Sequence, residues 1–417
     1  MPRQFGLNCI VYKHFSGHLT AACIQIQEKL DRPLLWLACR RHIGEILLDH
    51  VWKALSIEPS KSPEHQLFKR LRLNWDKLPH SDNSAFKTLS PDELSPVEKS
   101  RAIEYIEFGF QLLQAKNENG VMICRDDYRE LLELSLYYLK ELDPRVEAHF
   151  HSYKLKKCGA VHKARWMGKT NYLYKLVMLK DQILALGKGA IMSDAQAAKV
   201  QRFVIFLSLC YMKWWFCAPI ASKAPWMDLC LIKNIEALDD DIIRTAGLKA
   251  FKRHYWYICS ELVGLSLFDE SLATEEKSKM AQNLVQIKSL QIPVNRIGKG
   301  FGKPYFPEVV PDTLAELVGP DSLFLFHALS LDVSFLSIPV EQWPENQQYL
   351  YNKAVIKGLK VSNDAAERGV KLASDFLDTA RREERYQEIL QVVEMDRKLH
   401  SNLRKKRPKE DWFLYMD

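Results

Sequence analysis

Residues 33–51 have the sequence PLLWLACRRHIGEILLDHV, and this stretch decides the fold that we predict. Its first part, Leu34–Ala38, is a short apolar run entered through a proline, which is typical of a buried strand. From Arg40 onward, apolar residues recur three or four positions apart, which predicts a helix. The Cys-x-x-His sequence from Cys39 to His42 stands where the strand gives way to the helix.

The residues before this stretch repeat the same order. Leu7–Tyr12 is a short apolar run that predicts another strand, and Leu19–Leu30 has the apolar spacing of a helix. Strand, helix, strand and helix in succession are typical of a parallel α/β unit. We therefore predict such a unit over the first 58 residues.

The rest of the chain is predicted to be mainly helical. A polar stretch with scattered prolines, Pro59–Pro96, predicts a loop with short helical pieces, and Gln291–Pro311 predicts an irregular connection. Ser95, Ser193 and Thr274 are suited to cap helix N-termini. We expect helices over Pro96–Asn117, Arg125–Leu142, Ala164–Leu186, Asp194–Phe216, Pro225–Leu238, Asp240–Leu267, Thr274–Ile287, Val340–Lys357, Ser362–Phe376 and Arg381–His400.

Composition and charge exclude several classes of protein. Of the 417 residues, 47% are apolar and 27% are charged, so a wholly disordered chain is excluded. Lysine and arginine number 59 against 52 acids, a net charge of +7 that is compatible with an anionic partner. The nine cysteines form no CxxC pair and no secretory signal is visible, which predicts a reducing compartment, nuclear or cytoplasmic. Lys213 interrupts the longest apolar run, Phe203–Ile220, so we expect a buried helix there and no membrane partner.

A second signature, Ser362-Asn363-Asp364-Ala365-Ala366-Glu367-Arg368, stands at the start of a late predicted helix. Together with Cys39-Arg40-Arg41-His42, it resembles the hAT-type transposases, whose RNase H-like domain is split by an all-helical insertion. A further segment, from Cys158 to Met167, is similar to one in insect and other invertebrate relatives of that superfamily.

The resemblance implies a fold that is mostly α, with a remnant RNase H-like α/β unit interrupted by a large helical insertion. Residues 1–58 would be part of the RNase H-like unit, residues 59–355 the insertion, and residues 356–400 the helices that complete the unit. Residues 401–417 would form a basic tail, whose run Arg404–Pro408 is either a nuclear-localisation signal or phosphate contact, or a solvated tail. The front of the domain would be truncated.

In this family two Asp and one Glu hold the two metal ions that activate the attacking hydroxyl and stabilise the leaving oxygen. The resemblance assigns Glu367 as the third acid, and Cys39 and His42 as the family's C-x-x-H pair. The first acidic residue is Glu28, and Cys9–Ser16, where the second Asp would lie, holds no carboxylate. We therefore expect no catalysis, Glu367 as a relic, and no cofactor; Mg²⁺ would bind only if the missing acids were supplied.

Other clusters could hold a metal, and each has a simpler explanation. Cys39 and His42 could begin a zinc site, but a full site needs about four ligands and no second pair is suitably spaced, which favours a buried cysteine and a hydrogen-bonded histidine. The acids Asp239–Asp241 could bind a cation, but a helix N-terminus favours such residues too. We expect no metal site.

The segment Ala148–Lys180 carries eight cations and no acid. Cations neutralise phosphates, and interleaved aromatic rings can stack on exposed bases. In the resembled family the insertion contacts transposon ends and a tryptophan there can support a flipped base, a role that falls to Trp166. The alternative is a solvated helix face with buried aromatic residues. The residues that we expect to bind DNA are Lys154, Lys156, Lys157, Lys163, Arg165, Trp166 and Lys169.

Three functions remain open on this basis. The first is a transposase-derived protein, domesticated or degenerate, that is catalytically inactive, retains nucleic-acid (DNA) binding, and can self-associate. The second is a helical protein-interaction module without a nucleic-acid role. The third is a fragment of an active DDE-type transposase that is missing its N-terminal part.

Overall fold

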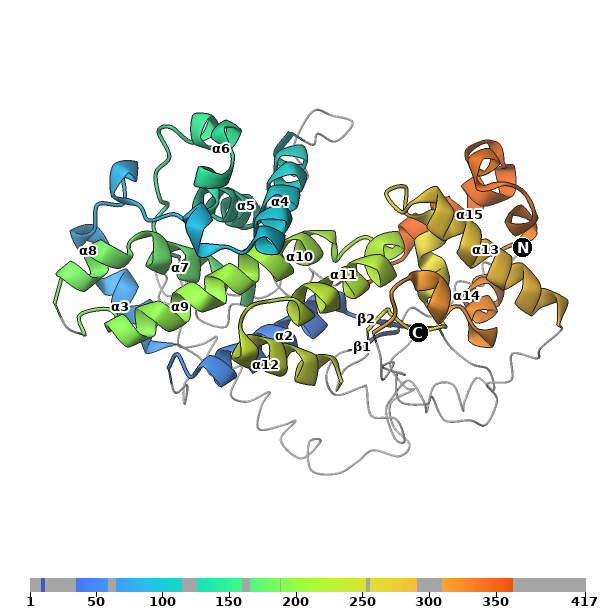
Figure 1. Cartoon of the computed structure of the whole chain (residues 1–417), viewed down its shortest axis with the longest axis horizontal. Coiled ribbons are helices and arrows are strands. Elements are labelled where there is room, and N and C mark those ends of the chain that lie inside the picture. The colour runs from blue at the N-terminus through green and yellow to red at the C-terminus, as the bar shows by residue number, and fades with distance from the viewer. Residues whose placement is uncertain are drawn as a thin grey trace, which may run out of the picture. The chain divides into compact units, whose positions relative to one another are not determined.

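The computed structural model describes residues 9–11, 35–58, 65–114, 126–159, 166–187, 189–252, 256–290 and 310–362. The chain divides into two compact units at Asn363, and all of the described residues belong to the first unit. This unit is mostly helical, as predicted (Figure 1). Its described α-helices are α2 (Arg40–Leu55), α3 (Gln66–Leu73), α4 (Pro96–Gln114), α5 (Asp126–Tyr138), α6 (Pro144–His149), α7 (Trp166–Met178), α8 (Lys180–Ala185), α9 (Asp194–Phe206), α10 (Met212–Cys217), α11 (Ala224–Glu236), α12 (Asp241–Phe251), α13 (Thr274–Ser289), α14 (Phe324–Ala328) and α15 (Gln347–Gly358).

Two short strands pair in parallel near the beginning of the chain. β1 (Cys9–Val11) lies alongside β2 (Trp36–Ala38), in register over all three residues. Each strand falls within an apolar run for which the sequence predicts a strand. The predicted helix Leu19–Leu30, which would connect them, lies outside the described residues.

Helix α2 follows β2 after one residue and is buried along one side. Its side chains Ile43, Leu47 and Val51 recur at helical spacing and are all buried. α2 packs along α12 and also contacts α9 (Figure 1). At Gly44 a Cβ atom would lie only 2.4 Å from the Trp214 ring, so the absence of a side chain there permits the close approach.

Most of the apolar run Phe203–Ile220 is buried, as predicted, although Ile220 at its end is exposed. The run is not one regular α-helix. A π-helical turn, Leu207–Tyr211, separates α9 from α10. A π-helical turn contains one residue more than an α-helical turn, so the side chains that follow it point in a different direction around the helix axis. Tyr211 and Trp214 both lie against Gly44 of α2. No helix that the structure describes is long and apolar enough to cross a bilayer.

The prediction of a single helix over Asp240–Leu267 is wrong. α12 ends at Phe251, whose ring stacks on Trp256 with 3.8 Å between the ring centroids. The backbone N–H of Tyr257 donates to the buried carboxylate of Asp228 at 2.8 Å, and the last part of the range forms a separate 3-10 helix. These tertiary contacts outweigh the apolar periodicity on which the prediction rested.

The helix predicted over Val340–Lys357 is also in two pieces. A 3-10 helix, Val340–Glu345, comes first, and α15 then begins after Asn346, whose side chain caps it. Pro344 has no N–H to donate, which is consistent with the interruption of a continuous helix at this point.

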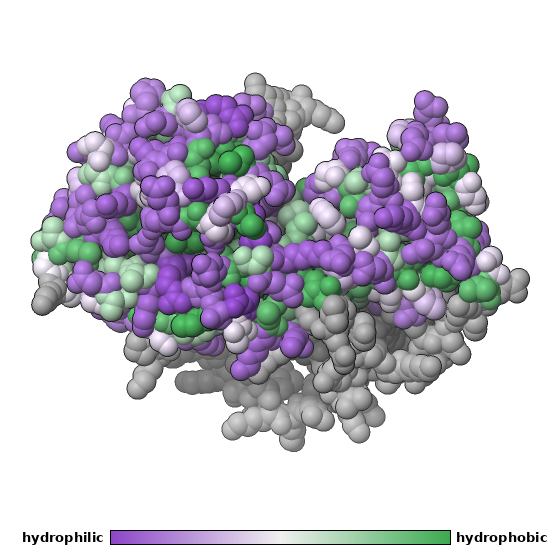
Figure 2. Space-filling model, in the orientation of Figure 1, coloured by the Kyte–Doolittle hydropathy of each residue, from purple (hydrophilic) through white to green (hydrophobic). Residues whose placement is uncertain are grey.

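Two of the three predicted caps are confirmed. Ser95 and Ser193 each accept a bond from the third residue of their helix, and a side chain at that position bonds back to the serine N–H. The prediction for Thr274 is one residue off, because Ala273 stands at the cap position of α13. The face of the molecule in Figure 2 is mainly hydrophilic, with apolar residues in small separate groups.

Candidate nucleic-acid interface

The C-x-x-H segment lies at the turn from β2 into α2. Cys39 is buried in front of the first turn of α2 and makes no side-chain cap. His42 is partly exposed, with Nδ1 3.8 Å from the carboxylate of Glu45. Within the described ranges, no three His, Cys, Asp or Glu side chains come together as a metal site.

Arg40 is completely buried at the start of α2. Its guanidinium donates to Asp228 at 2.7 Å and to the Cys217 carbonyl at 3.2 Å. The carboxylate of Asp228 also accepts a bond from Trp214 Nε1 at 2.6 Å and one from the backbone of Tyr257. The buried charges are therefore paired, and the network joins α2, α10 and α11 to the segment that follows α12.

The far end of the described chain returns to this turn. The backbone N–H of Arg40 donates to the carbonyl of Val361 at 2.9 Å, and the side chains of Leu359 and Val361 are buried. Residues Arg40 and Val361 are thus in contact although most of the chain lies between them. The second signature begins at Ser362, and Glu367 within it lies outside the described residues.

Three of the predicted DNA-binding lysines project from one extended segment. Lys154, Lys156 and Lys157 are exposed, whereas Leu155 between them is buried. The backbone N–H of Leu155 donates to the carbonyl of His80 at 2.9 Å, which holds the segment against the chain that follows α3. The inward leucine keeps the lysines pointing to solvent.

Acidic side chains from other elements face two of these lysines. Lys156 lies 3.7 Å from Glu133, and Lys157 lies 3.3 Å from Asp76, whose side chain is 82% exposed. Lys154 makes no ion pair with any residue that the structure describes. The Lys157–Asp76 pair is exposed on both sides and such ion pairs are weak, so a phosphate can compete with the Asp76 carboxylate.

Helix α3 contributes cations that sequence reasoning missed. Lys69 and Arg72 lie one turn apart on the same side of the helix, and Lys77 follows in the next turn of chain. Arg72 is hydrogen-bonded to Tyr172 of α7, and Tyr172 donates to the Gly159 carbonyl. These contacts place the end of α3 beside the extended segment. We call these six cations the basic surface: Lys69, Arg72, Lys77, Lys154, Lys156 and Lys157.

A signal for α3 was present in the sequence. Its eight residues contain three cations and no acid, and the apolar positions Leu67, Phe68 and Leu71 have helical spacing. All three are buried. The prolines around this helix favour a loop with short helical pieces over Pro59–Pro96. The prediction therefore does not single out α3 as a basic amphipathic helix.

Trp166 lies in the core. Its side chain is only 7% exposed, and its ring is stacked on Phe203 and meets Trp52 edge-on at 5.6 Å. Tyr172 and Tyr174 of the same helix are buried too. In this arrangement these rings fill the interior, and none of them has a free face for a nucleobase.

Two more lysines of the cationic segment lie apart from the basic surface. Lys169 is half-buried above the Trp166 ring at 4.4 Å, and burial lowers its pKa while the carboxylate of Asp49 opposes that effect. Lys175 is 2% exposed and forms an ion pair with Glu130 at 2.6 Å. Both lysines therefore use their charge in contacts within the protein, with the Trp166 ring and with Glu130.

Some predicted features fall outside the described residues or find a structural explanation. Lys163, Arg165 and the basic run Arg404–Pro408 lie outside the described ranges. Asp240 caps α12 and pairs with Arg202 at 2.7 Å, as expected for an acid at a helix N-terminus.

Comparison with known proteins returned no match: no family model, no curated protein and no solved structure is similar to this chain.

Proposed function

We propose that this protein binds DNA through the basic surface. The observation that carries the proposal is that α3, the 3-10 turn Trp75–Lys77 and the extended segment 153–158 together present six cations. Among the described residues, Asp76 and Glu133 are the acids that pair with the lysines of the extended segment. Cations on a water-exposed surface attract phosphates and release counterions when DNA binds. Because the rings of Trp166 and its neighbours are buried, the expected contacts are to the phosphate backbone.

We also propose that the chain is derived from an hAT-type transposase and contains a split RNase H-like unit. Two observations support this origin. β1 and β2 pair in parallel, and the helical region between Arg40 and Val361 has its two ends hydrogen-bonded to each other. A helical insertion into an α/β unit requires ends that meet in this way. Glu367 follows Val361 by six residues and would enter the unit from that point.

Catalysis is not part of the proposal. The described residues of β1 are Cys-Ile-Val, and no carboxylate from that strand is available to hold a metal ion. Cys39 and His42 would then stabilise the turn between β2 and α2, and Glu367 would be a relic. In the competing function, a helical interaction module, the same surface would have no affinity for DNA.

The test compares two variants of equal charge. In the first, Lys69, Lys77 and Lys154 are all changed to Glu; in the second, the exposed Lys279, Lys288 and Lys357 of α13 and α15 are changed to Glu. Binding to a fluorescent 30-base-pair duplex (about three helical turns) is measured by anisotropy at low salt. The first variant is expected to bind at least about tenfold more weakly, and the second about as well as the unchanged chain. Equal losses in both, or no binding by the unchanged chain, would refute the proposal.

A further inference from the structure

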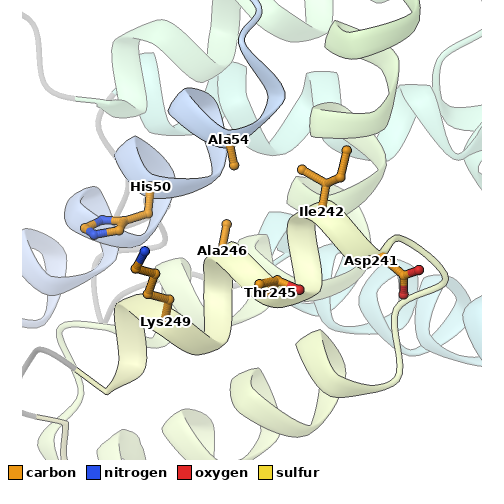
Figure 3. A pocket seen from close by; sticks show the side chains of 7 residues that line it. All are labelled: His50, Ala54, Asp241, Ile242, Thr245, Ala246 and Lys249. Carbon is orange, nitrogen blue, oxygen red and sulfur yellow. The ribbon is translucent and has the colours of Figure 1, made fainter.

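A shallow hollow of about 540 Å³ lies between α2 and α12 (Figure 3). Its floor is made by small side chains, Ala54 of α2 and Ala246 of α12, which leave room between the two helices. Ile242 stands at its rim with 46% of its surface exposed. An exposed isoleucine beside an apolar floor favours contact with another apolar surface.

Polar side chains of α12 follow the hollow in a regular order. Asp241, Thr245 and Lys249 are each four residues apart, so they form one stripe along the helix, with the acid at one end and the cation at the other (Figure 3). Asp241 pairs within the chain only with Arg244, three residues on, as far as the described residues show. Lys249 has no ion-pair partner among them.

This stripe is complementary to itself. A twofold axis places the same patch of two copies face to face, so that each residue meets its counterpart from the other end of the stripe. With the axis at Thr245, Asp241 of one copy meets Lys249 of the other, and the reverse pair forms as well. Two helices that pack through rows of residues four apart cross readily at an angle of about 50°.

We propose that this face is the contact between two copies of the chain, with their α12 helices antiparallel about Thr245. In the dimer, Ile242 of each copy is buried against the apolar floor of the hollow in the other. The inference is independent of DNA binding, because none of these residues belongs to the basic surface.

The contact is small, and this sets the strength of the dimer. One pair of crossing helices buries less than the about 1,200–2,000 Å² of a standard stable interface. The dimer is therefore reversible and forms at micromolar or higher protein concentration. Its two interchain ion pairs are exposed, so they mainly fix the antiparallel orientation while the apolar contact holds the copies together.

The test is sedimentation velocity on the full chain without DNA, from about 1 µM to about 100 µM, where weak contacts of this size assemble. The unchanged chain is expected to shift from monomer to dimer across this range. Asp241→Lys alone and Lys249→Asp alone each bring like charges together and are expected to raise the dissociation constant at least about tenfold. The double variant brings opposite charges together again and is expected to regain most of the affinity.

Two controls keep the result specific. Lys279→Asp on α13 makes a similar charge change away from the hollow and is expected to leave the dimer unchanged. Circular dichroism checks that each variant keeps its helix content. A chain that stays monomeric over the whole range, whatever else binds the hollow, overturns the proposal. A dimer that neither single reversal weakens, or that the double variant fails to restore, overturns it too.

Discussion

Arg40, Lys154 and Lys175 carry the same charge but lie in three different environments. Arg40 is buried in a hydrogen-bonded network, Lys175 is buried against Glu130, and Lys154 is exposed without an ion pair to another described residue. A count of charges along the sequence treats them alike, because burial depends on partners that come from distant elements. For this reason the sequence could indicate a cationic segment but could not say which of its members reach solvent.

At Asp228 we expect a large loss of stability on truncation. Asp228→Ala leaves the guanidinium of Arg40 buried without its carboxylate, which should lower the free energy of unfolding by about 3–5 kcal/mol. Asp228→Asn retains an acceptor oxygen and should cost less. Urea denaturation measures both. As a control, Asp181→Ala removes an exposed pair with Lys87 and should cost at most about 1 kcal/mol; a similar loss at both sites would contradict the account.

His65 should make stability fall in mild acid. Burial among the rings of Trp52 and Phe68, helped by the charge of Lys169, lowers the pKa of His65 to about 4. The unfolded chain takes up this proton near pH 6.5 and the folded chain does not, so stability present above that pH is lost as pH falls towards 4. From pH 7.5 to pH 5 this group should contribute a loss of about 2 kcal/mol.

The measurement is urea denaturation at both pH values for the unchanged chain and for His65→Phe. The variant should show a smaller loss between the two pH values, by about 2 kcal/mol, because phenylalanine takes up no proton. An identical pH dependence in the two proteins would show that His65 titrates normally.

At the scale of helices and strands, the sequence predicts well where local signals agree. The two strands, the buried α2 and the caps at Ser95 and Ser193 all follow from periodicity and capping chemistry. The prediction of one helix over Asp240–Leu267 fails because the chain after Phe251 is held by contacts to distant residues. The π-helical turn Leu207–Tyr211 leaves no mark in the apolar pattern, since every residue in it is buried.

Gly44 tests how closely α2 and α10 pack. In Gly44→Ala the new methyl group would come within 2.4 Å of the Trp214 ring, so the rigid ring or the helix must move. Overpacking of about 1–3 kcal/mol should exceed the gain in helix propensity of about 1 kcal/mol, and thermal denaturation should show a lower midpoint. Gly358→Ala in α15, where no atom lies within 4 Å, should not be destabilising. Equal effects at both positions would argue against the close approach.

At the scale of the whole described unit, two features stand together: a helical region whose ends are hydrogen-bonded to each other at Arg40 and Val361, and a basic surface formed by α3, the 3-10 turn after it and the extended segment. The sequence indicates the lysines of the extended segment, but it does not show that α3 stands beside them. It also suggests Trp166 as a base-stacking residue, and the structure places this side chain against Phe203. In both cases the outcome depends on tertiary packing, which apolar periodicity and charge counts cannot predict.

The most direct test of DNA binding is the dependence of affinity on salt. If most of the six cations of the basic surface contact phosphates, a plot of log affinity against log salt should have a slope of about −4 to −5, near −0.9 per phosphate. Changing Lys69, Lys77 and Lys154 to Glu should reduce the magnitude of the slope by about 3. A slope near zero, or one that the triple variant leaves unchanged, would contradict the claim that this surface binds DNA.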